Sequence, residues 1–323
     1  MMFTETRFSG APMNFLSRVS LLSIISICGA AHAASPVSLP DWKAVIPEVV
    51  GSLGAGASKE NSGIVKSRHY DDVYWVQNDS GDEPKVYPVH LDGSLWTAER
   101  YQDMPGVEIA GAINVDWEDI TMDDKGHLIV CDVGNNRNDR RDLVLYYLNE
   151  PSPIAGRTTL KKKVFFRYPD QKNYPATHSD FNYDCEGVFF ANGKIYFISK
   201  NRSDTFTKLY RLDHYDSEVT NELTYLDRFD IGGKTTAADA TPDGRRLAVT
   251  TYRALWVFET DGVTDSYFDG KVYWLPFESS QVEAVCFQDP ETILLADEQS
   301  AKIMRIRFAD MKRVDTKDFT PID

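Results

Sequence analysis

The stretch DWEDITMDDKGHLIVCDVGNNRNDRRDLVLYYL, residues 116–148, places acidic residues where short apolar runs begin and end. Glu118 lies near the start of the first run, and Asp132 closes the second run fourteen residues later. Alternating apolar and polar residues over short runs predict β-strands, and the DDKG between them predicts a turn. We therefore interpret the stretch as three antiparallel strands with carboxylates at their ends.

Four other stretches repeat this pattern of two β-type runs joined by a turn. They are NSGIVKSRHYDDVYWVQND (61–79), DCEGVFFANGKIYFISK (184–200), AADATPDGRRLAVTTY (237–252) and VEAVCFQDPETILLAD (282–297). A third run follows in every unit. A fourth is predicted in SLWTAERY (94–101), KVFFRY (163–168), LTYLDRF (223–229), KVYWLPF (271–277) and RVDTKDF (313–319).

Units of four strands repeated along a chain are typical of β-propellers. The sequence thus predicts an all-β fold, a β-propeller of five four-stranded blades. The segment VIPEVVGSL (45–53) precedes the first repeat and predicts an extra strand. This strand either pairs with the last blade and closes the ring or belongs to a sixth blade, and the sequence leaves both open.

The N-terminus has the pattern of an export signal. Arg18 precedes the apolar run LLSIISICGAA, and Ala31-His32-Ala33 fits a cleavage site, so we expect a signal peptide over 1–33 and one propeller domain over 34–323. Cys28 leaves a lipoprotein as an alternative. We expect a periplasmic or secreted protein.

The charge and hydropathy of the chain exclude two classes of partner. The formal net charge is −14, and removal of 1–33 would make it −15, which disfavours nucleic acid and anionic membranes. No later run reaches the ~18 apolar residues of a membrane helix. We expect a monomer that acts on a small-molecule or polymeric ligand. Of the three cysteines beyond the signal, we expect either buried thiols or one disulfide and a leftover thiol: Cys131, Cys185 and Cys286.

The propeller geometry explains the acidic strand ends. In a pair of antiparallel strands, the start of the first strand and the end of the second lie at the same end of the sheet. Glu118 and Asp132, Glu186 and Lys200, and Glu283 and Asp297 should therefore meet at one rim. The sequence predicts an acidic funnel there, formed by Asp79, Glu118, Asp119, Asp132, Asp184, Glu186, Asp239, Glu283, Asp297 and Glu298. Positive charge at this rim is expected only from Lys200, Arg137 and Arg253.

The motifs DWEDI, DVGNNR, CEGV, TPDGRRLAV and VEAV resemble those of exported bacterial propellers known as phytase-like, or esterase-like phytase-type, proteins. The resemblance covers most of residues 60–310. It implies an acidic, calcium-favouring central site, with Glu118, Asp132 and Glu186 at the acidic motif positions and Asp239 in the fourth repeat. Calcium-dependent phytases have six blades, whereas five are expected here.

Calcium is the cofactor that these residue types favour. It takes six to eight oxygen ligands, and crowded carboxylates need a counter-ion. The expected ligands are Glu118, Asp119, Asp132, Asn135, Asn136, Asp239, Glu283 and Asp297. Asp and Asn also cap turns, and for DVGNNR this alternative stays open.

Two classes of function remain. One is a metal-dependent hydrolase of phosphate or other esters, with Glu186 as general base and Lys200 and His178 as further catalytic candidates. Tyr252, Arg137 and Arg253 are then expected to contact the ligand. The alternative is a non-catalytic propeller that binds a ligand or protein.

Overall fold

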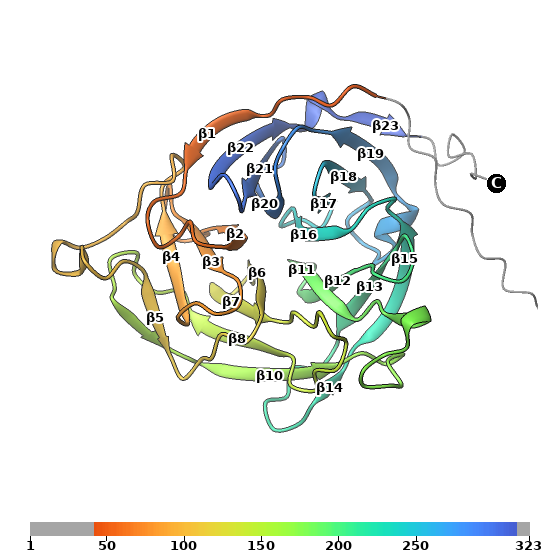
Figure 1. Cartoon of the computed structure of the whole chain (residues 1–323), viewed down its shortest axis with the longest axis horizontal. Coiled ribbons are helices and arrows are strands. Elements are labelled where there is room, and N and C mark those ends of the chain that lie inside the picture. Colours follow the sequence, from red (N-terminus) through yellow and green to blue (C-terminus); the bar gives the residue numbers. More distant parts are fainter. Residues whose placement is uncertain (1–41, 315–323) are drawn as a thin grey trace, which may run out of the picture. The chain divides into compact units, whose positions relative to one another are not determined.

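The computed structural model describes residues 42–314, and these form five blades around one axis (Figure 1). The described residues contain no α-helix, only short 3-10 turns. The five-bladed prediction is confirmed. The predicted signal peptide and most of RVDTKDF lie outside the described residues.

Each blade is a sheet of four or five strands. Blade 1 contains β2 (Asn61–Lys66), β3 (Tyr74–Asn78), β4 (Lys85–Val89), β5 (Val107–Ala110) and β9 (Arg157–Thr159). Blade 2 contains β6 (Trp117–Met122), β7 (His127–Asp132), β8 (Val144–Asn149), β10 (Lys162–Arg167) and β14 (Asn221–Glu222). Blade 3 contains β11 (Asp184–Ala191), β12 (Lys194–Lys200), β13 (Phe206–Leu212) and β15 (Thr224–Asp230). Blade 4 contains β16 (Thr235–Ala240), β17 (Arg246–Thr251), β18 (Ala254–Glu259), β19 (Lys271–Pro276) and β23 (Lys312–Val314). Blade 5 contains β20 (Val282–Asp289), β21 (Thr292–Asp297), β22 (Lys302–Arg307) and β1 (Glu48–Ser52).

The ring is closed by the N-terminal strand. β1 pairs antiparallel with β22, so the extra strand predicted in 45–53 completes the last blade (Figure 1). Three short strands also cross to the preceding blade: β9 pairs with β5, β14 with β10 and β23 with β19. These crossings cover sheet edges that would otherwise expose unpaired backbone groups.

Two of the five predicted fourth strands were wrong. The segment 94–101 contains only an isolated bridge at Leu95 and a 3-10 turn, η1 (Glu99–Tyr101), and β5 follows it as the fourth strand. The described part of 313–319 lies in β23 and belongs to blade 4, because β1 already occupies the edge of blade 5. The cause in both cases is tertiary pairing, which local pattern does not encode.

Hydrophobic clusters lie between neighbouring blades. Five such clusters are formed by the described residues, each shared by two adjacent sheets. All three cysteines of the described part are buried and free, as the first of the two alternatives expected. The first strands β2, β6, β11, β16 and β20 contact one another in a ring and are buried along almost their entire length.

Close approach of these first strands makes Gly187 a sensitive position. A Cβ there would lie 2.6 Å from Ala238 Cβ and 2.8 Å from the Ala238 nitrogen. We expect Gly187→Ala to lower the free energy of unfolding by about 1–3 kcal/mol, the usual effect of overpacking. Urea denaturation measures this. Gly54→Ala is the matched control, because its Cβ would meet nothing closer than 3.5 Å. Equal stabilities of the two variants would contradict this account of the inter-blade packing.

Candidate functional site

A β-bulge recurs near the start of every first strand. The register shifts between Asn61 and Gly63, and at the equivalent positions of β6, β11, β16 and β20. The extra residues are Ser62, Glu118, Glu186, Thr236 and Glu283. A bulge re-aims a side chain and is common next to functional sites. Three of the five bulge residues are therefore glutamates at one end of the strands, and all three are buried.

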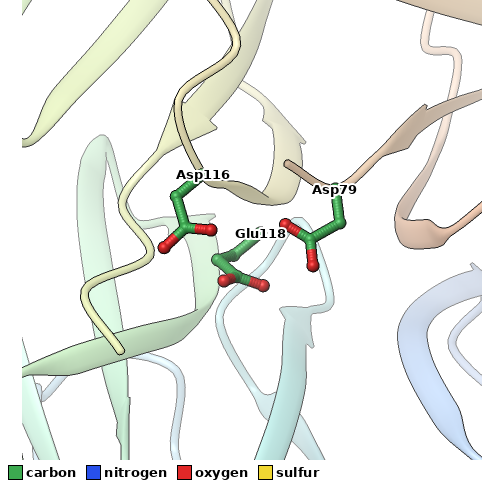
Figure 2. Close-up of side chains that lie close together, drawn as sticks. All are labelled: Asp79, Asp116 and Glu118. Atoms are coloured by element: carbon green, nitrogen blue, oxygen red, sulfur yellow. The ribbon is translucent and has the colours of Figure 1, made fainter. Parts of the chain in front are cut away.

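The first cluster of this rim consists of Asp79, Asp116 and Glu118. One carboxylate oxygen from each lies within 4.8 Å of the other two. Asp79 follows β3, Asp116 precedes β6, and Glu118 is the bulge residue of β6 (Figure 2). Among residues 42–314, no Lys, Arg or His nitrogen lies within 4 Å of these carboxylates, since the nearby arginines pair with Asp132 and Asp184. Within the described part of the chain, the Asp79–Asp116–Glu118 cluster thus forms no ion pair with a basic side chain.

The second cluster shares Glu118 and adds Asp184 and Glu186, again with oxygens within 4.8 Å of one another. Here the protein supplies its own cations. Lys200 Nζ lies 2.9 Å from Glu186 Oε2, and Arg202 Nε donates to Asp184 Oδ2 at 2.8 Å. The two clusters therefore differ in the feature that governs cation binding, the presence of a basic side chain.

Burial and like charge raise the pKa of the rim carboxyls. Burial raises the pKa of Asp79 to about 7, and the charge of Asp116 adds to this. Burial and the charge of Glu283 raise the pKa of Glu298 to about 7. Burial and Glu186 raise the pKa of Glu118 well above its usual value. Burial also raises the pKa of Glu186, although Lys200 opposes it. The raised pKa values favour a bound proton or a bound cation at this rim.

These shifts predict how stability depends on pH. The unfolded carboxyls have a pKa near 4, so at pH 6 the folded protein holds protons on Asp79 and Glu298 that the unfolded chain lacks. Their contribution to stability is complete below the unfolded pKa and is lost as pH rises through about 7. In EDTA we expect these two groups to lower the unfolding temperature as the pH rises from about 4 to about 7, and to have little further effect above that. Asp79→Asn should weaken this dependence and the exposed Asp124→Asn should not, whereas a flat profile in wild type would contradict it.

The DVGNNR loop lies at the rim, but its side chains are used within the protein. Asp132 accepts a hydrogen bond from Arg140 Nη1 at 2.8 Å. The Asn135 amide oxygen accepts from the backbone nitrogens of Asp139 and Arg140, both at 2.9 Å. The Asn136 amide oxygen accepts from Arg202. The structure therefore does not bring Asp132 and Asn135 into either cluster, and turn capping accounts for Asn135.

Three further expected metal ligands also lie elsewhere. Asp119 is buried between blades and accepts from the Val188 nitrogen at 2.7 Å. Asp297 accepts from Ser279, Ser280, Ser300 and the Gln281 nitrogen, bonds that lower its pKa. Asp239 lies toward the opposite end of β16. The expected position of this residue was wrong because the fourth repeat is aligned two residues out of register with the others. The bulge residue there is Thr236, not Ala238.

The remaining candidate residues differ in how far they are exposed to solvent. Glu283 is buried at the rim and accepts from Gln281 Nε2 at 2.7 Å. The Tyr252 ring centre lies 5.5 Å from Lys200 Nζ, so this predicted ligand contact is a neighbour of a catalytic candidate. Arg253 and Arg137 are exposed, and Arg137 lines a cavity of about 360 Å³ next to Asp116. His178 is exposed in the 3-10 turn η2 (His178–Asp180).

Two site residues escaped the sequence reasoning, namely Asp116 and Arg202. A signal for Asp116 exists, because Asp-x-Glu occurs at 116–118 and again at 184–186, each time ending on the bulge glutamate. For Arg202 the signal is weaker, since its only mark is a second basic residue just after Lys200.

Comparisons with known proteins address the fold. No protein-family model matches the chain, and no curated protein matches it. The PQQ-bound aldose sugar dehydrogenase of Streptomyces coelicolor is 10% identical over 81% of this chain and 97% of that one, with a TM-score of 0.48. A candidate gluconolactonase is 15% identical over 87% and 99%, with a TM-score of 0.44. Hydrazine synthase of Kuenenia stuttgartiensis is 11% identical over 76% and 71%, with a TM-score of 0.45. None of these likenesses carries information about the ligand or reaction of this chain. The described residues contain no helix long and apolar enough to cross a membrane.

Proposed function

We propose that the rim is a calcium-dependent hydrolytic site that acts on a phosphate or other ester. The observation that carries this proposal is the contrast between the two clusters. The Asp79–Asp116–Glu118 cluster has no basic partner among the described residues, whereas Lys200 and Arg202 stand beside Asp184 and Glu186. A cation position next to basic side chains suits an anionic substrate.

The residues of the first cluster fit a hard cation. All three are carboxylates, the donors that calcium prefers, and no His or Cys is among them. Gly134 leaves room for them, because a Cβ at this position would overlap Glu118 Oε1 and the Asp116 carboxylate. Calcium takes six to eight oxygens, so water and substrate would supply the others.

The roles of the protein side chains follow from their positions. When bound, calcium would supply Lewis-acid polarisation of the ester or phosphoryl oxygen. Lys200 and Arg202 would hold anionic oxygens of the substrate, and Tyr252 would line the same side. Glu186 would accept the proton of the attacking water, because Lys200 at 2.9 Å favours its charged form against the burial that raises its pKa. Perturbed carboxyls of this kind cluster at functional sites.

A second candidate function has its own supporting observation. Lys200 and Arg202 are already paired with carboxylates, and Arg140 is held by Asp132 and the Gly134 carbonyl. Fully paired cations favour a rigid rim that binds a ligand or protein without turning it over. In this alternative the calcium position would be structural.

We also propose that the protein is exported to the periplasm or outside the cell and belongs with the phytase-like propellers. The pattern of residues 1–33 and the resembling motifs support this. Cell fractionation and N-terminal sequencing of the mature protein test it, since recovery of an uncleaved chain in the cytosol would contradict export.

One experiment separates the two functions. The purified full chain is analysed for bound metal and then assayed on a panel of phosphomonoesters, phosphodiesters and carboxylic esters. We expect turnover that EDTA abolishes and calcium restores. Bound calcium without turnover on any ester would favour the binding function, and the absence of both would reject the proposal.

A further inference from the structure

A second cavity lies at the opposite end of the first strands from the acidic rim. Its volume is about 580 Å³, and its walls are the ends of β2, β6, β16 and β20 with the hairpins that follow them. Most of the lining is apolar and includes Val65, Met122, Ala240 and Phe287. Cavities of roughly 300–1,000 Å³ with apolar walls and a few polar groups are typical of small-molecule sites.

Two opposite charges line this cavity, and neither forms an ion pair within 4 Å with a side chain of residues 42–314. Asp239 accepts from the Phe287 nitrogen at 2.8 Å and from the Ala240 nitrogen, and the nearby charge of Arg68 favours its carboxylate form without an ion pair within 4 Å. Arg68 is exposed, forms no ion pair with a described carboxylate, and has its Cζ 5.7 Å from the Phe190 ring centre. Asp239 belongs to blade 4 and Arg68 to the β2–β3 hairpin of blade 1, so they stand on different walls.

The other charged groups of the lining already have partners. Lys66 Nζ donates to the Gln288 carbonyl at 2.7 Å. Asp243 accepts from Thr241 Oγ1 at 2.6 Å, and Asp289 accepts from the Glu291 nitrogen at 2.9 Å. Asp239 and Arg68 thus offer a ligand one carboxylate and one guanidinium from different blades, neither of them in an ion pair with a described side chain.

We propose that this cavity binds a small zwitterionic amino compound with an apolar side chain, such as an apolar α-amino acid. Its ammonium group pairs with Asp239, its carboxylate pairs with Arg68, and its side chain packs against Val65, Met122 and Phe287. A ligand with a single charge leaves one of the two protein charges without a partner. The site is separate from the acidic rim and does not depend on the function proposed there.

Calorimetric titration of the full chain with three probes that share one ring tests the charge requirement. The probes are L-phenylalanine, which carries both charges, phenethylamine, which has only the ammonium, and 3-phenylpropionate, which has only the carboxylate. We expect saturable binding of phenylalanine, and affinities about tenfold lower for each singly charged probe, because a hydrogen bond to a charged group is lost. Absence of phenylalanine binding, or equal affinity for the three probes, would overturn the proposal.

Variants test which protein residue binds each charged group of the ligand. Asp239→Asn, which keeps an acceptor for the Phe287 nitrogen, should weaken phenylalanine about tenfold and leave 3-phenylpropionate unchanged. Arg68→Met should do the reverse, weakening phenylalanine and sparing phenethylamine, and its exposed side chain makes misfolding a minor concern. Asp243→Asn at the cavity and Glu118→Gln at the rim are controls that should bind phenylalanine like wild type. Unchanged phenylalanine affinity in Arg68→Met would overturn the assignment even if Asp239→Asn failed to fold.

Discussion

Calcium is expected to raise the unfolding temperature of the wild-type protein and to leave that of Glu118→Gln almost unchanged. A ligand that binds only the folded state stabilises it by about 2.7 kcal/mol at 100 times its Kd. For a chain of this size the shift is on the order of 5 °C. Glu118 belongs to both carboxylate clusters, so its charge contributes to any cation at the rim. Differential scanning fluorimetry with and without calcium measures the shift.

The metal-free protein should respond to the same substitution in the opposite sense. Glu118 is buried beside Glu186, Asp79 and Asp184, and these like charges raise its pKa. Glutamine carries no charge and needs no proton to stay buried, so in EDTA Glu118→Gln should unfold at the same temperature as wild type or higher. A variant that is stable in EDTA and whose unfolding temperature does not change with calcium has lost the calcium site and kept the fold.

Two further variants locate the cation. Gly134→Ala should also reduce the calcium shift, because its Cβ would displace the Glu118 and Asp116 carboxylates. Asp124→Asn, on the exposed β6–β7 hairpin, should retain the full shift. If wild type, Glu118→Gln and Gly134→Ala all gain equally from calcium, the ion binds elsewhere.

The second large effect is on turnover. Glu186→Gln should lower kcat by roughly 10²-fold or more, the usual contribution of a positioned general base. Glu186 is buried, its Oε2 lies 2.9 Å from Lys200 Nζ, and its carboxylate is the group that would take the proton of water. Steady-state kinetics on any ester that the wild type cleaves provides the measurement.

Glu283→Gln is the matched control for this variant. Glu283 is the bulge residue of the next acidic blade and is also buried, but it forms no ion pair within 4 Å among the described residues. We expect it to retain most of the turnover, and both variants to keep the wild-type far-ultraviolet circular dichroism. Full activity in Glu186→Gln would remove this residue from the mechanism and leave the rim with a binding role.

The local pattern was sufficient to predict the repeating strands. Each hairpin consists of two alternating runs joined by a turn such as DDKG or TPDG, and these signals involve neighbouring residues only. The fourth repeat shows the limit of this reasoning. Its acidic residue, Asp239, seemed one position out of line with the glutamates, whereas the register puts Thr236 at the bulge. This two-residue error has no mark in the sequence, because Thr235, Thr236, Ala237 and Ala238 are all small.

Strand periodicity and spacing, which repeat along the chain, predicted a propeller of five or six blades with glutamates at one rim. The pairing of β1 with β22 fixes the number at five. Which carboxylates converge depends on tertiary contacts between blades. Asp116 joins Asp79 from another blade, while Asp132 and Asp297 turn to partners in their own loops. Some carboxylates accept hydrogen bonds from donors in their own loop, and others face carboxylates of another blade. The sequence does not distinguish the two cases. They differ only in where the bulges and loops direct their oxygens.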